Sequence, residues 1–111
     1  MQVIKLYLPM KDNDGDDLMW RHSNFIDTIS VNKHLITGFT RYQAEGFWFD
    51  SDTVYKDDIK IYEFHVSNKD VSLVYRLLKN QARALCLQMK QECIYLQLNN
   101  DTELVKSVNN D

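Results

Sequence analysis

The chain has 111 residues and a formal net charge of −3, from 16 acidic and 13 basic residues. This length suits one hydrophobic core, because single domains most often have about 100–150 residues. The acidic residues are spread along the chain and no basic stripe is present to neutralise phosphates, so no nucleic-acid partner is expected. No stretch approaches the roughly eighteen apolar residues of a transmembrane helix, so no membrane span is expected.

The cysteines and the first ten residues favour a reducing compartment. A chain able to bury its own core does not need a disulfide, and we interpret Cys86 and Cys93 as partly buried thiols. Residues 1–10 contain one lysine and then a proline, without the basic and long apolar regions of a signal peptide. We therefore expect a cytoplasmic protein.

The first predicted element is a strand over residues 3–8, whose side chains alternate between an apolar side and a mixed side. A charged turn follows, in which Asp16 or Asp17 can cap a helix that extends to about Ser30. The apolar residues of this helix recur at intervals of three, four and seven and form one face: Leu18, Met19, Phe25, Ile26 and Ile29.

Two more strands are predicted over residues 38–44 and 60–67. Residues 45–59 connect them. Neighbouring strands usually need about three to six connecting residues, so this connection is unusually long. It is also unusually aromatic, since it carries Phe47, Trp48, Phe49 and Tyr55, together with the aliphatic Val54.

The second predicted helix begins after Asn68 or Asp70, either of which can cap it. Its apolar residues repeat every 3.6 residues on average, which makes it the clearest element of the sequence. They are Val71, Val74, Tyr75, Leu78, Ala82, Leu85 and Met89. Residues 93–98 then alternate in the manner of a last strand.

This order of elements, β-α-β-β-α-β, is that of the ferredoxin-like fold. We therefore predict one α+β domain over residues 1–98, with a four-stranded antiparallel sheet. Both helices should cover one face of the sheet, because such crossovers are right-handed. Residues 99–111 are rich in Asn and Asp, and we predict a polar C-terminal tail that frays or lies on a partner.

One face of this sheet is left without helices. Its expected side chains are those of Val3, Tyr7 and Tyr95, together with Ile61 or Tyr62. These are too apolar for a wet surface, so we favour a homo-oligomer that buries them. The alternative is that scattered aromatic side chains are simply tolerated on the surface.

The acidic turn over residues 12–17 does not have the spacing of a calcium loop. An EF-hand needs glycine at its sixth position and a carboxylate at its twelfth. Here glycine is fourth and the twelfth residue is Ser23. His22, His34 and His65 have no metal-ligand spacing with one another or with the cysteines. We expect neither a metal nor a cofactor.

Aromatic and acidic residues gather in and beside the long connection. They are Tyr42, Glu45, Trp48, Tyr55, Asp57 and Asp58. Aromatic faces attract cations, and carboxylates on walls of low dielectric strengthen that attraction. The cluster therefore suits a small, positively charged ligand. The alternative is structural, because a long hairpin can need aromatic side chains to hold it against the sheet.

Several short motifs occur in an order and spacing found in a known family. They are the run D-L-M-W-R-H at residues 17–22, the strand start at Gly38, the G-F-W step at residues 46–48, and A-L-C-L-Q-M-K-Q-E-C-I-Y at residues 84–95. In these motifs, across most of its length, the chain resembles the S-adenosylmethionine (SAM) hydrolases of T-odd bacteriophages, now regarded as lyases. None of the motifs is diagnostic by itself.

The resemblance implies a trimer of ferredoxin-like subunits with active sites between subunits. It also implies a lyase that cleaves SAM to methylthioadenosine and homoserine lactone, in the cytoplasm of a host if the chain is phage-encoded. The sulfonium is a good leaving group and the carboxylate of the substrate can attack its own γ-carbon. Holding the folded substrate can therefore supply most of the catalysis, without metal, base or covalent nucleophile.

The resemblance also implies roles for individual residues. Trp48 corresponds to an aromatic that is tyrosine in the family. In the family a glutamate holds the substrate's amino group. It corresponds to Asp58 in this chain, or to Asp57 if the gap between the two sequences is placed differently. A C-terminal acid from another subunit corresponds to Asp101 or Glu103. We include Tyr42, Glu45 and Tyr55 as further substrate-binding candidates.

The departures at Trp48 and at the aspartates keep a second function open. Tryptophan has no hydroxyl, and aspartate is one methylene shorter than glutamate. Either change could mean lost activity or a different ligand. The alternative function is a non-enzymatic oligomeric protein that sequesters a host protein or a small signalling ligand.

Overall fold

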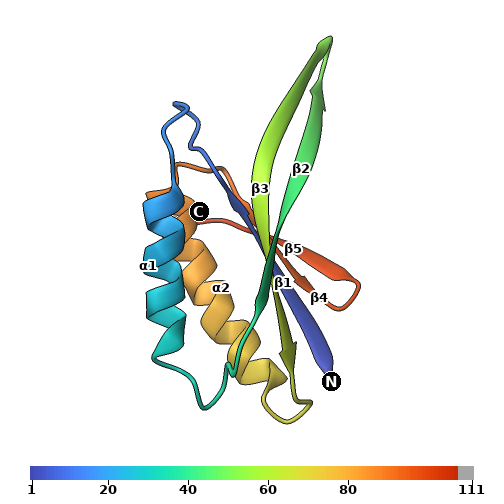
Figure 1. The fold of residues 1–111 in the computed structure, drawn as a ribbon. Helices are drawn as coiled ribbons and strands as arrows, with labels where there is room; N and C mark the ends of the chain where they lie inside the picture. Colours follow the sequence, from blue (N-terminus) through green and yellow to red (C-terminus); the bar gives the residue numbers. More distant parts are fainter. Residues whose placement is uncertain (108–111) are drawn as a thin grey trace.

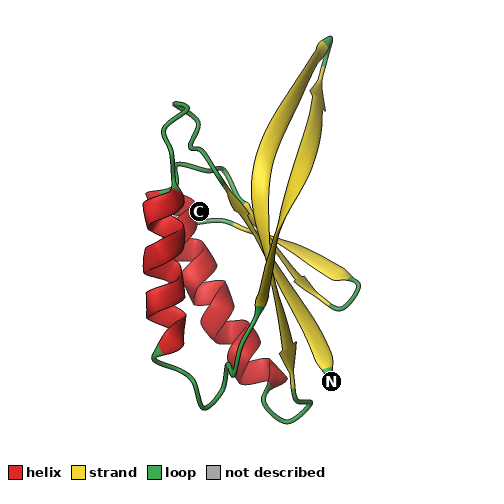
Figure 2. Cartoon of the chain, viewed as in Figure 1, coloured by secondary structure: helices red, strands yellow, loops and turns green. Residues whose placement is uncertain are grey.

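The computed structural model describes residues 1–107 and has two layers, a sheet and a pair of helices on one of its faces (Figures 1 and 2). In chain order the elements are β1 (Gln2–Pro9), α1 (Met19–Ser30), β2 (Thr40–Asp50), β3 (Thr53–Val66), α2 (Val71–Gln88), β4 (Ile94–Leu98) and β5 (Asp101–Val105). The predicted α+β class and the order of the first six elements are confirmed.

The sheet of the described chain has five strands, in the order β2-β3-β1-β4-β5, and all neighbours are antiparallel. The prediction of four strands was therefore wrong by one. The fifth strand lies within residues 99–111, which were predicted to be a tail. The remainder of that predicted tail, residues 108–111, lies outside the described residues.

The fifth strand forms because Asn99 turns the chain back. Asn99 has a positive φ of 53°, which asparagine tolerates better than most residues. Its side-chain Oδ1 accepts a hydrogen bond from the Val3 amide at 3.0 Å, and its own amide donates to the Val3 carbonyl at 2.8 Å. The chain then pairs with β4, and Val105 enters the core with 2% of its surface exposed.

The predicted connection over residues 45–59 is mostly strand. β2 and β3 pair continuously from Thr40 opposite Glu63 to Asp50 opposite Thr53, so a two-residue turn replaces the expected loop. Ser51 in that turn has a φ of 53°, as tight hairpin turns require. The hairpin extends beyond the rest of the molecule (Figure 1).

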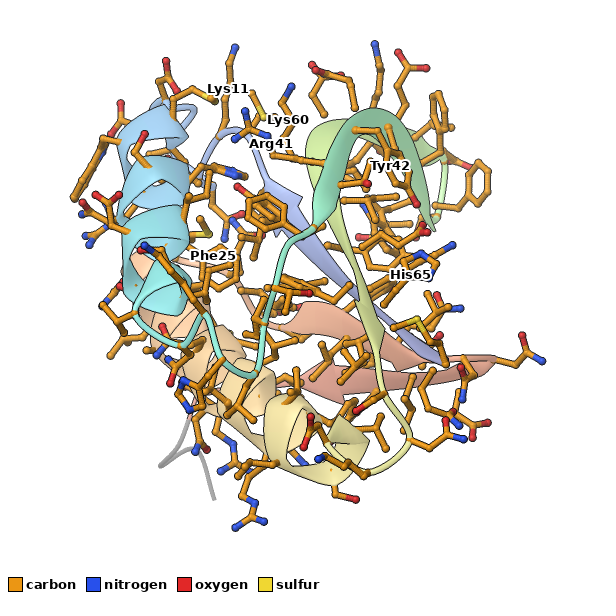
Figure 3. The ribbon with its side chains drawn as sticks, turned by 60° about the horizontal axis from the view of Figure 1, so that its bottom comes forward. Lys11, Phe25, Arg41, Tyr42, Lys60 and His65 are labelled. Atoms are coloured by element: carbon orange, nitrogen blue, oxygen red, sulfur yellow. The ribbon has the colours of Figure 1, made fainter. Side chains whose placement is uncertain are left out.

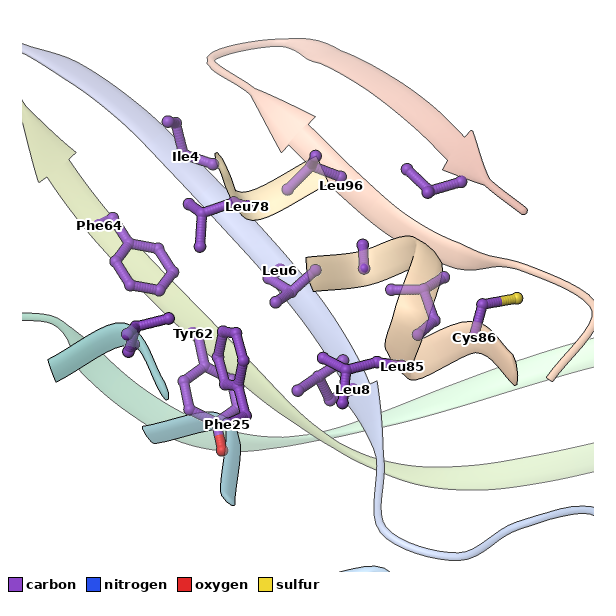
Figure 4. Packing of buried hydrophobic residues seen from close by; sticks show 14 of the residues in the cluster. Ile4, Leu6, Leu8, Phe25, Tyr62, Phe64, Leu78, Leu85, Cys86 and Leu96 are labelled. Atoms are coloured by element: carbon purple, nitrogen blue, oxygen red, sulfur yellow. The ribbon is translucent and has the colours of Figure 1, made fainter. Parts of the chain in front are cut away.

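The core lies between the sheet and the two helices (Figure 4). β1 contributes Ile4, Leu6 and Leu8, which are fully buried. The predicted apolar face of α1 is confirmed at Leu18, Phe25 and Ile29, all buried. The predicted stripe of α2 is confirmed by a set of buried residues: Val74, Leu78, Ala82, Leu85 and Met89.

The helix caps differ in detail from the prediction. The first residue before α1 is Leu18, and the Asp17 Oδ1 accepts a hydrogen bond from the Met19 amide at 2.8 Å. Asp70 precedes α2 but makes no side-chain bond to the helix. Its carboxylate instead accepts a hydrogen bond from the Ser67 hydroxyl at 3.1 Å. Tertiary packing of the apolar faces therefore contributes more to these helices than capping does.

The sequence pattern placed either Ile61 or Tyr62 on the uncovered sheet face. In the structure Tyr62 faces the helices. It is fully buried, and its ring contacts those of Phe25 and Phe39 at centroid distances of 5.1 and 5.4 Å. Ile61 is its neighbour in β3 and therefore faces the opposite side. Of these two residues, Ile61 is therefore the one on the uncovered face.

Tyr62 also bonds to His22, the buried histidine of α1. The His22 Nε2 lies 2.8 Å from the Pro9 carbonyl oxygen, which can only accept, so Nε2 carries the proton. The unprotonated Nδ1 then accepts a hydrogen bond from the Tyr62 hydroxyl at 2.7 Å. Neutral His22 thus has both ring nitrogens satisfied, and it ties α1 to the end of β1.

This arrangement predicts that the fold is less stable in mild acid. Burial lowers the pKa of His22 below its ordinary value of 6.5. The unfolded chain gains a proton near pH 6.5 and the folded chain only at lower pH, so stability falls as the pH drops below about 6.5. Urea unfolding between pH 7.5 and 5.5 should show a slope of up to about 1.4 kcal/mol per pH unit from this group.

The matched control is His22→Gln, which removes the titrating group. Its unfolding free energy should be lower than that of the wild type at pH 7.5, and should vary less between pH 6.5 and 5.5. An equal pH dependence in the two proteins would assign the effect to other groups.

Candidate functional site

A cleft of about 700 Å³ lies on the side of the sheet opposite the helices. The outer part of the hairpin β2–β3 forms one wall. The ends of β1 and β4 form the floor, and the loop that precedes β4 borders the cleft. The walls include Tyr7, Trp48, Tyr55, Asp57 and Tyr95. This volume is within the range of about 300–1,000 Å³ that is usual for small-molecule sites.

The two faces of the hairpin separate the residues predicted for the site. Residues directly opposite in an antiparallel pair share a face, and neighbours along a strand alternate. Gly46 pairs with Asp57 and Trp48 pairs with Tyr55, and these residues line the cleft. Asp58 is on the other face. Figure 3 shows the same alternation nearer the core, where Arg41 and Lys60 lie on one side and Tyr42 on the other.

Trp48 and Asp57 form the central contact of the cleft. The indole Nε1 donates a hydrogen bond to the Asp57 Oδ2 at 2.6 Å, across the paired strands. The indole lies over Gly46, where an added Cβ would be 3.6 Å from Nε1. The Trp48 ring also meets the Tyr95 ring edge to face, with centroids 5.3 Å apart. The hairpin therefore bends across the end of β1 until it reaches β4.

Asp58 and Glu45 lie opposite each other on the other face of the hairpin, with Lys56 between them. The Lys56 Nζ is 2.9 Å from the Glu45 Oε2 and 3.8 Å from the Asp58 Oδ1. The hydrogen bond that Lys56 donates to the Glu45 carboxylate raises the pKa of Lys56. Glu45 borders the cleft, but its carboxylate is committed to this lysine. Of the two neighbouring aspartates, Asp57 is the one that faces the cleft.

Tyr42 is outside the cleft although it shares its face. Its hydroxyl donates a hydrogen bond to the Glu63 Oε1 at 3.1 Å. Glu63 also lies 3.8 Å from the Lys5 Nζ and 2.8 Å from the His65 Nε2. The uncovered face is therefore apolar near the cleft and polar farther along β1, where the sequence led us to expect an apolar surface.

The two C-terminal acids are also away from this cleft. Asp101 begins β5 and is exposed. Glu103 faces α2, where it accepts a hydrogen bond from the Tyr75 hydroxyl at 2.7 Å and forms an ion pair with Lys79 at 2.5 Å. The hydrogen bond from Lys79 lowers the pKa of Glu103. Within one chain, neither acid contributes to the site.

Of the cleft residues that were not predicted for the site, three carry an aromatic ring or a carboxylate: Tyr7, Tyr95 and Glu92. The sequence placed both tyrosines on the uncovered face, but it gave no sign that the hairpin bends over them. Glu92 lies in the loop before β4, inside a motif that indicates only the family resemblance. The described lining contains carboxylates and the electron-rich faces of aromatic rings, and it includes no lysine or arginine. Such a lining suits a cationic ligand.

Metal and membrane sites are absent from the part of the chain that the structure describes. Residues 1–107 contain no group of three His, Cys, Asp or Glu side chains arranged to hold a metal ion. None of the helices in this range is long and apolar enough to span a membrane. Cys86 and Cys93 are free thiols, the first buried and the second half-buried.

Comparisons with known proteins identify the fold. No family model matches the chain, and no curated protein matches its sequence. A solved phage SAM lyase in complex with S-methyl-5'-thioadenosine has a TM-score of 0.66 and 13% identity, over 99% of this chain and 92% of its own. A phage SAM lyase in the apo state has a TM-score of 0.67 and 9% identity, and the match covers 97% of this chain and 90% of the lyase chain.

A third structure, a point variant of CutA1 from Pyrococcus horikoshii OT3, has a TM-score of 0.51 and 13% identity, over 100% of this chain and 89% of its own. All three identities are low, so these likenesses establish the fold alone. Two of the structures belong to the class of protein that the sequence motifs resemble.

Proposed function

We propose that the chain is a SAM lyase that acts in the cleft between the hairpin β2–β3 and the ends of β1 and β4. The observation that carries the proposal is the Asp57 carboxylate, held by the Trp48 indole within an aromatic cleft. The likeness of the fold to phage SAM lyases supports it. The cytoplasm, where SAM is available, is the expected compartment.

The charges of SAM suit this cleft. Its sulfonium and ammonium groups are cationic, and only its carboxylate is anionic. We assign the ammonium to Asp57, whose Oδ2 accepts the Trp48 N–H and whose Oδ1 remains for the ligand. The face of the Trp48 indole offers stacking surface to the nucleoside.

The proposed reaction needs no group from the protein to react covalently. A carboxylate oxygen of SAM attacks its own γ-carbon, the carbon–sulfur bond breaks, and its electron pair passes to sulfur. The products are methylthioadenosine and homoserine lactone. Sulfonium and carboxylate charges are both lost, so an apolar cleft that excludes water favours the transition state. Holding the carboxylate and the γ-carbon of the substrate close together supplies the remaining rate enhancement.

This charge balance decides which group Asp57 should hold. A carboxylate placed against the sulfonium would stabilise the substrate more than the transition state, because the sulfonium charge disappears. The ammonium keeps its charge throughout the reaction. Binding it fixes the amino-acid end of the substrate without opposing the chemistry.

Incubation of the purified protein with SAM tests the proposal. Chromatography should detect methylthioadenosine, and mass spectrometry should detect homoserine lactone in equal amount. A reaction mixture without product above the buffer control would reject the lyase function. Homoserine in place of its lactone at early times would instead indicate attack by water.

We further propose that three chains assemble so that each cleft lies between subunits. In one chain Trp48 is 43% exposed and Tyr55 is 52% exposed, which is high for the walls of an enzyme site. Leu104, on the same sheet face, is 53% exposed. A partner that covers these side chains would close the cleft and bury apolar surface. In sedimentation equilibrium the protein should have three times the mass of the chain. A single-chain mass at micromolar concentration would contradict this assembly.

A second candidate function is favoured by the tip of the hairpin. Phe47, Phe49 and Val54 share the face turned away from the cleft, and they are 53%, 80% and 61% exposed. Exposed apolar patches of this kind often mark protein contacts. A non-enzymatic protein that sequesters a host protein would use this surface. Thermal stabilisation by SAM would support the lyase, since a ligand that binds only the folded chain stabilises it.

A further inference from the structure

The contact between Trp48 and Tyr95 joins two parts of the molecule that are distant in the sheet. Trp48 belongs to β2, at one edge, and Tyr95 belongs to β4, on the far side of β3 and β1. The rings meet at 89°, an edge-to-face geometry that aromatic pairs prefer. Tyr95 therefore supports the inner face of the hairpin where the hairpin bends over the cleft.

Tyr95 is itself held firmly in the sheet. Its neighbours Ile94 and Leu96 are buried in the core, and its backbone is paired with Tyr7. The Tyr7 ring contacts the Tyr95 ring at a centroid distance of 6.1 Å, and the Tyr7 hydroxyl donates a hydrogen bond to the Gln97 Oε1 at 2.9 Å. The support under Trp48 thus belongs to the rigid layer of the protein.

The outer hairpin has little other support. Residues 51–58 are all exposed, and the paired strands extend beyond the helices that cover the rest of the sheet (Figure 1). Within one chain, a two-stranded ribbon whose main packing is the contact of Trp48 with Tyr95 is only marginally stable in its position. The position of the Asp57 carboxylate therefore depends on what holds Trp48.

We infer that Tyr95 is a positioning residue of the proposed lyase: its ring fixes Trp48, whose indole N–H holds the Asp57 Oδ2 and directs the Oδ1 toward the substrate's ammonium. The inference rests on the proposed function. Tyr95 acts in it through its ring and not its hydroxyl, because the ring makes the contact with Trp48. Nothing in the sequence had assigned Tyr95 to the site.

The variants Tyr95→Leu and Tyr95→Phe separate the ring from the hydroxyl. Both are made in a Trp20→Phe background, because Trp20 is 55% exposed and lies on α1, away from the cleft. Trp48 is then the only tryptophan of the sequence, and acrylamide quenching of its fluorescence reports how well the indole is held. Product formation from SAM is measured with the same proteins.

With Tyr95→Leu we expect stronger quenching of Trp48 and a two- to tenfold decrease in kcat/KM, about the size of one aromatic pair. With Tyr95→Phe both values should stay near those of the background. Unchanged quenching in Tyr95→Leu would overturn the inference, and so would stronger quenching without loss of kcat/KM. Equal losses in Tyr95→Phe and Tyr95→Leu would also overturn it, because they would assign the role to the hydroxyl.

The failure of the proposed function would be recognised separately. A background protein that forms no methylthioadenosine rejects the lyase function, and with it the role of Tyr95 toward SAM. The quenching data would then decide only whether Tyr95 holds Trp48.

Discussion

Replacing Asp57 with asparagine is expected to lower the rate of methylthioadenosine formation by about 10- to 100-fold. The amide has the same shape, and its oxygen can still accept the Trp48 N–H, so the hairpin should keep its structure. What is lost is the negative charge opposite the substrate's ammonium. Hydrogen bonds to charged groups contribute about 1.5–3 kcal/mol, and each 1.4 kcal/mol corresponds to a tenfold change.

Asp58→Asn is the matched control, because it changes the neighbouring carboxylate on the other face of the same strand. Asp58 contacts Lys56 at 3.8 Å and does not line the cleft. Its loss should change the rate less than about twofold, in line with the small contribution of surface ion pairs. Full activity in Asp57→Asn together with a large loss in Asp58→Asn would place the site on the other face of the hairpin.

Replacing Tyr62 with alanine is expected to destabilise the fold by about 3–5 kcal/mol, as other buried aromatic truncations do. Tyr62 is fully buried, and its ring packs against Phe25, Phe39 and His22. The truncation removes these contacts and the hydrogen bond to the His22 Nδ1. Urea unfolding followed by circular dichroism at pH 7.5 measures the loss.

Tyr62→Phe separates the ring from its hydroxyl. This variant keeps the aromatic packing and leaves the buried His22 Nδ1 without its donor, which costs about 1–3 kcal/mol. The expected order of stability is wild type, Tyr62→Phe, Tyr62→Ala. Equal stability of the two variants would mean that the hydrogen bond, and not the ring packing, accounts for the contribution of Tyr62.

The sequence predicted those parts of the fold whose apolar pattern has one clear period. The stripe of α2 and the alternation of β1 are read directly from residues such as Leu78 and Leu6. The strand β5 was missed because residues 99–103 are all polar and its two apolar residues, Leu104 and Val105, are adjacent and show no alternation. Its existence depends on the turn at Asn99 and on pairing with β4, which are tertiary features.

The candidate site was predicted in composition but not in geometry. The aromatic and acidic residues of the hairpin were recognised together, yet a connection treated as a loop gives no alternation to separate Asp57 from Asp58. Once β2 and β3 are paired, their register shows that Asp57, and not Asp58, points toward the cleft. Tyr7 and Tyr95 enter the site only because the hairpin bends, and no local sequence signal specifies that bend.

The most direct measurement is a crystal structure with a SAM analogue in which carbon replaces the sulfonium sulfur, so that it cannot be cleaved. The analogue's amino group should lie within hydrogen-bond distance, about 3 Å, of the Asp57 carboxylate, with its nucleoside beside Trp48. An analogue bound against Lys56 and Asp58, on the opposite face of the hairpin, would contradict the account.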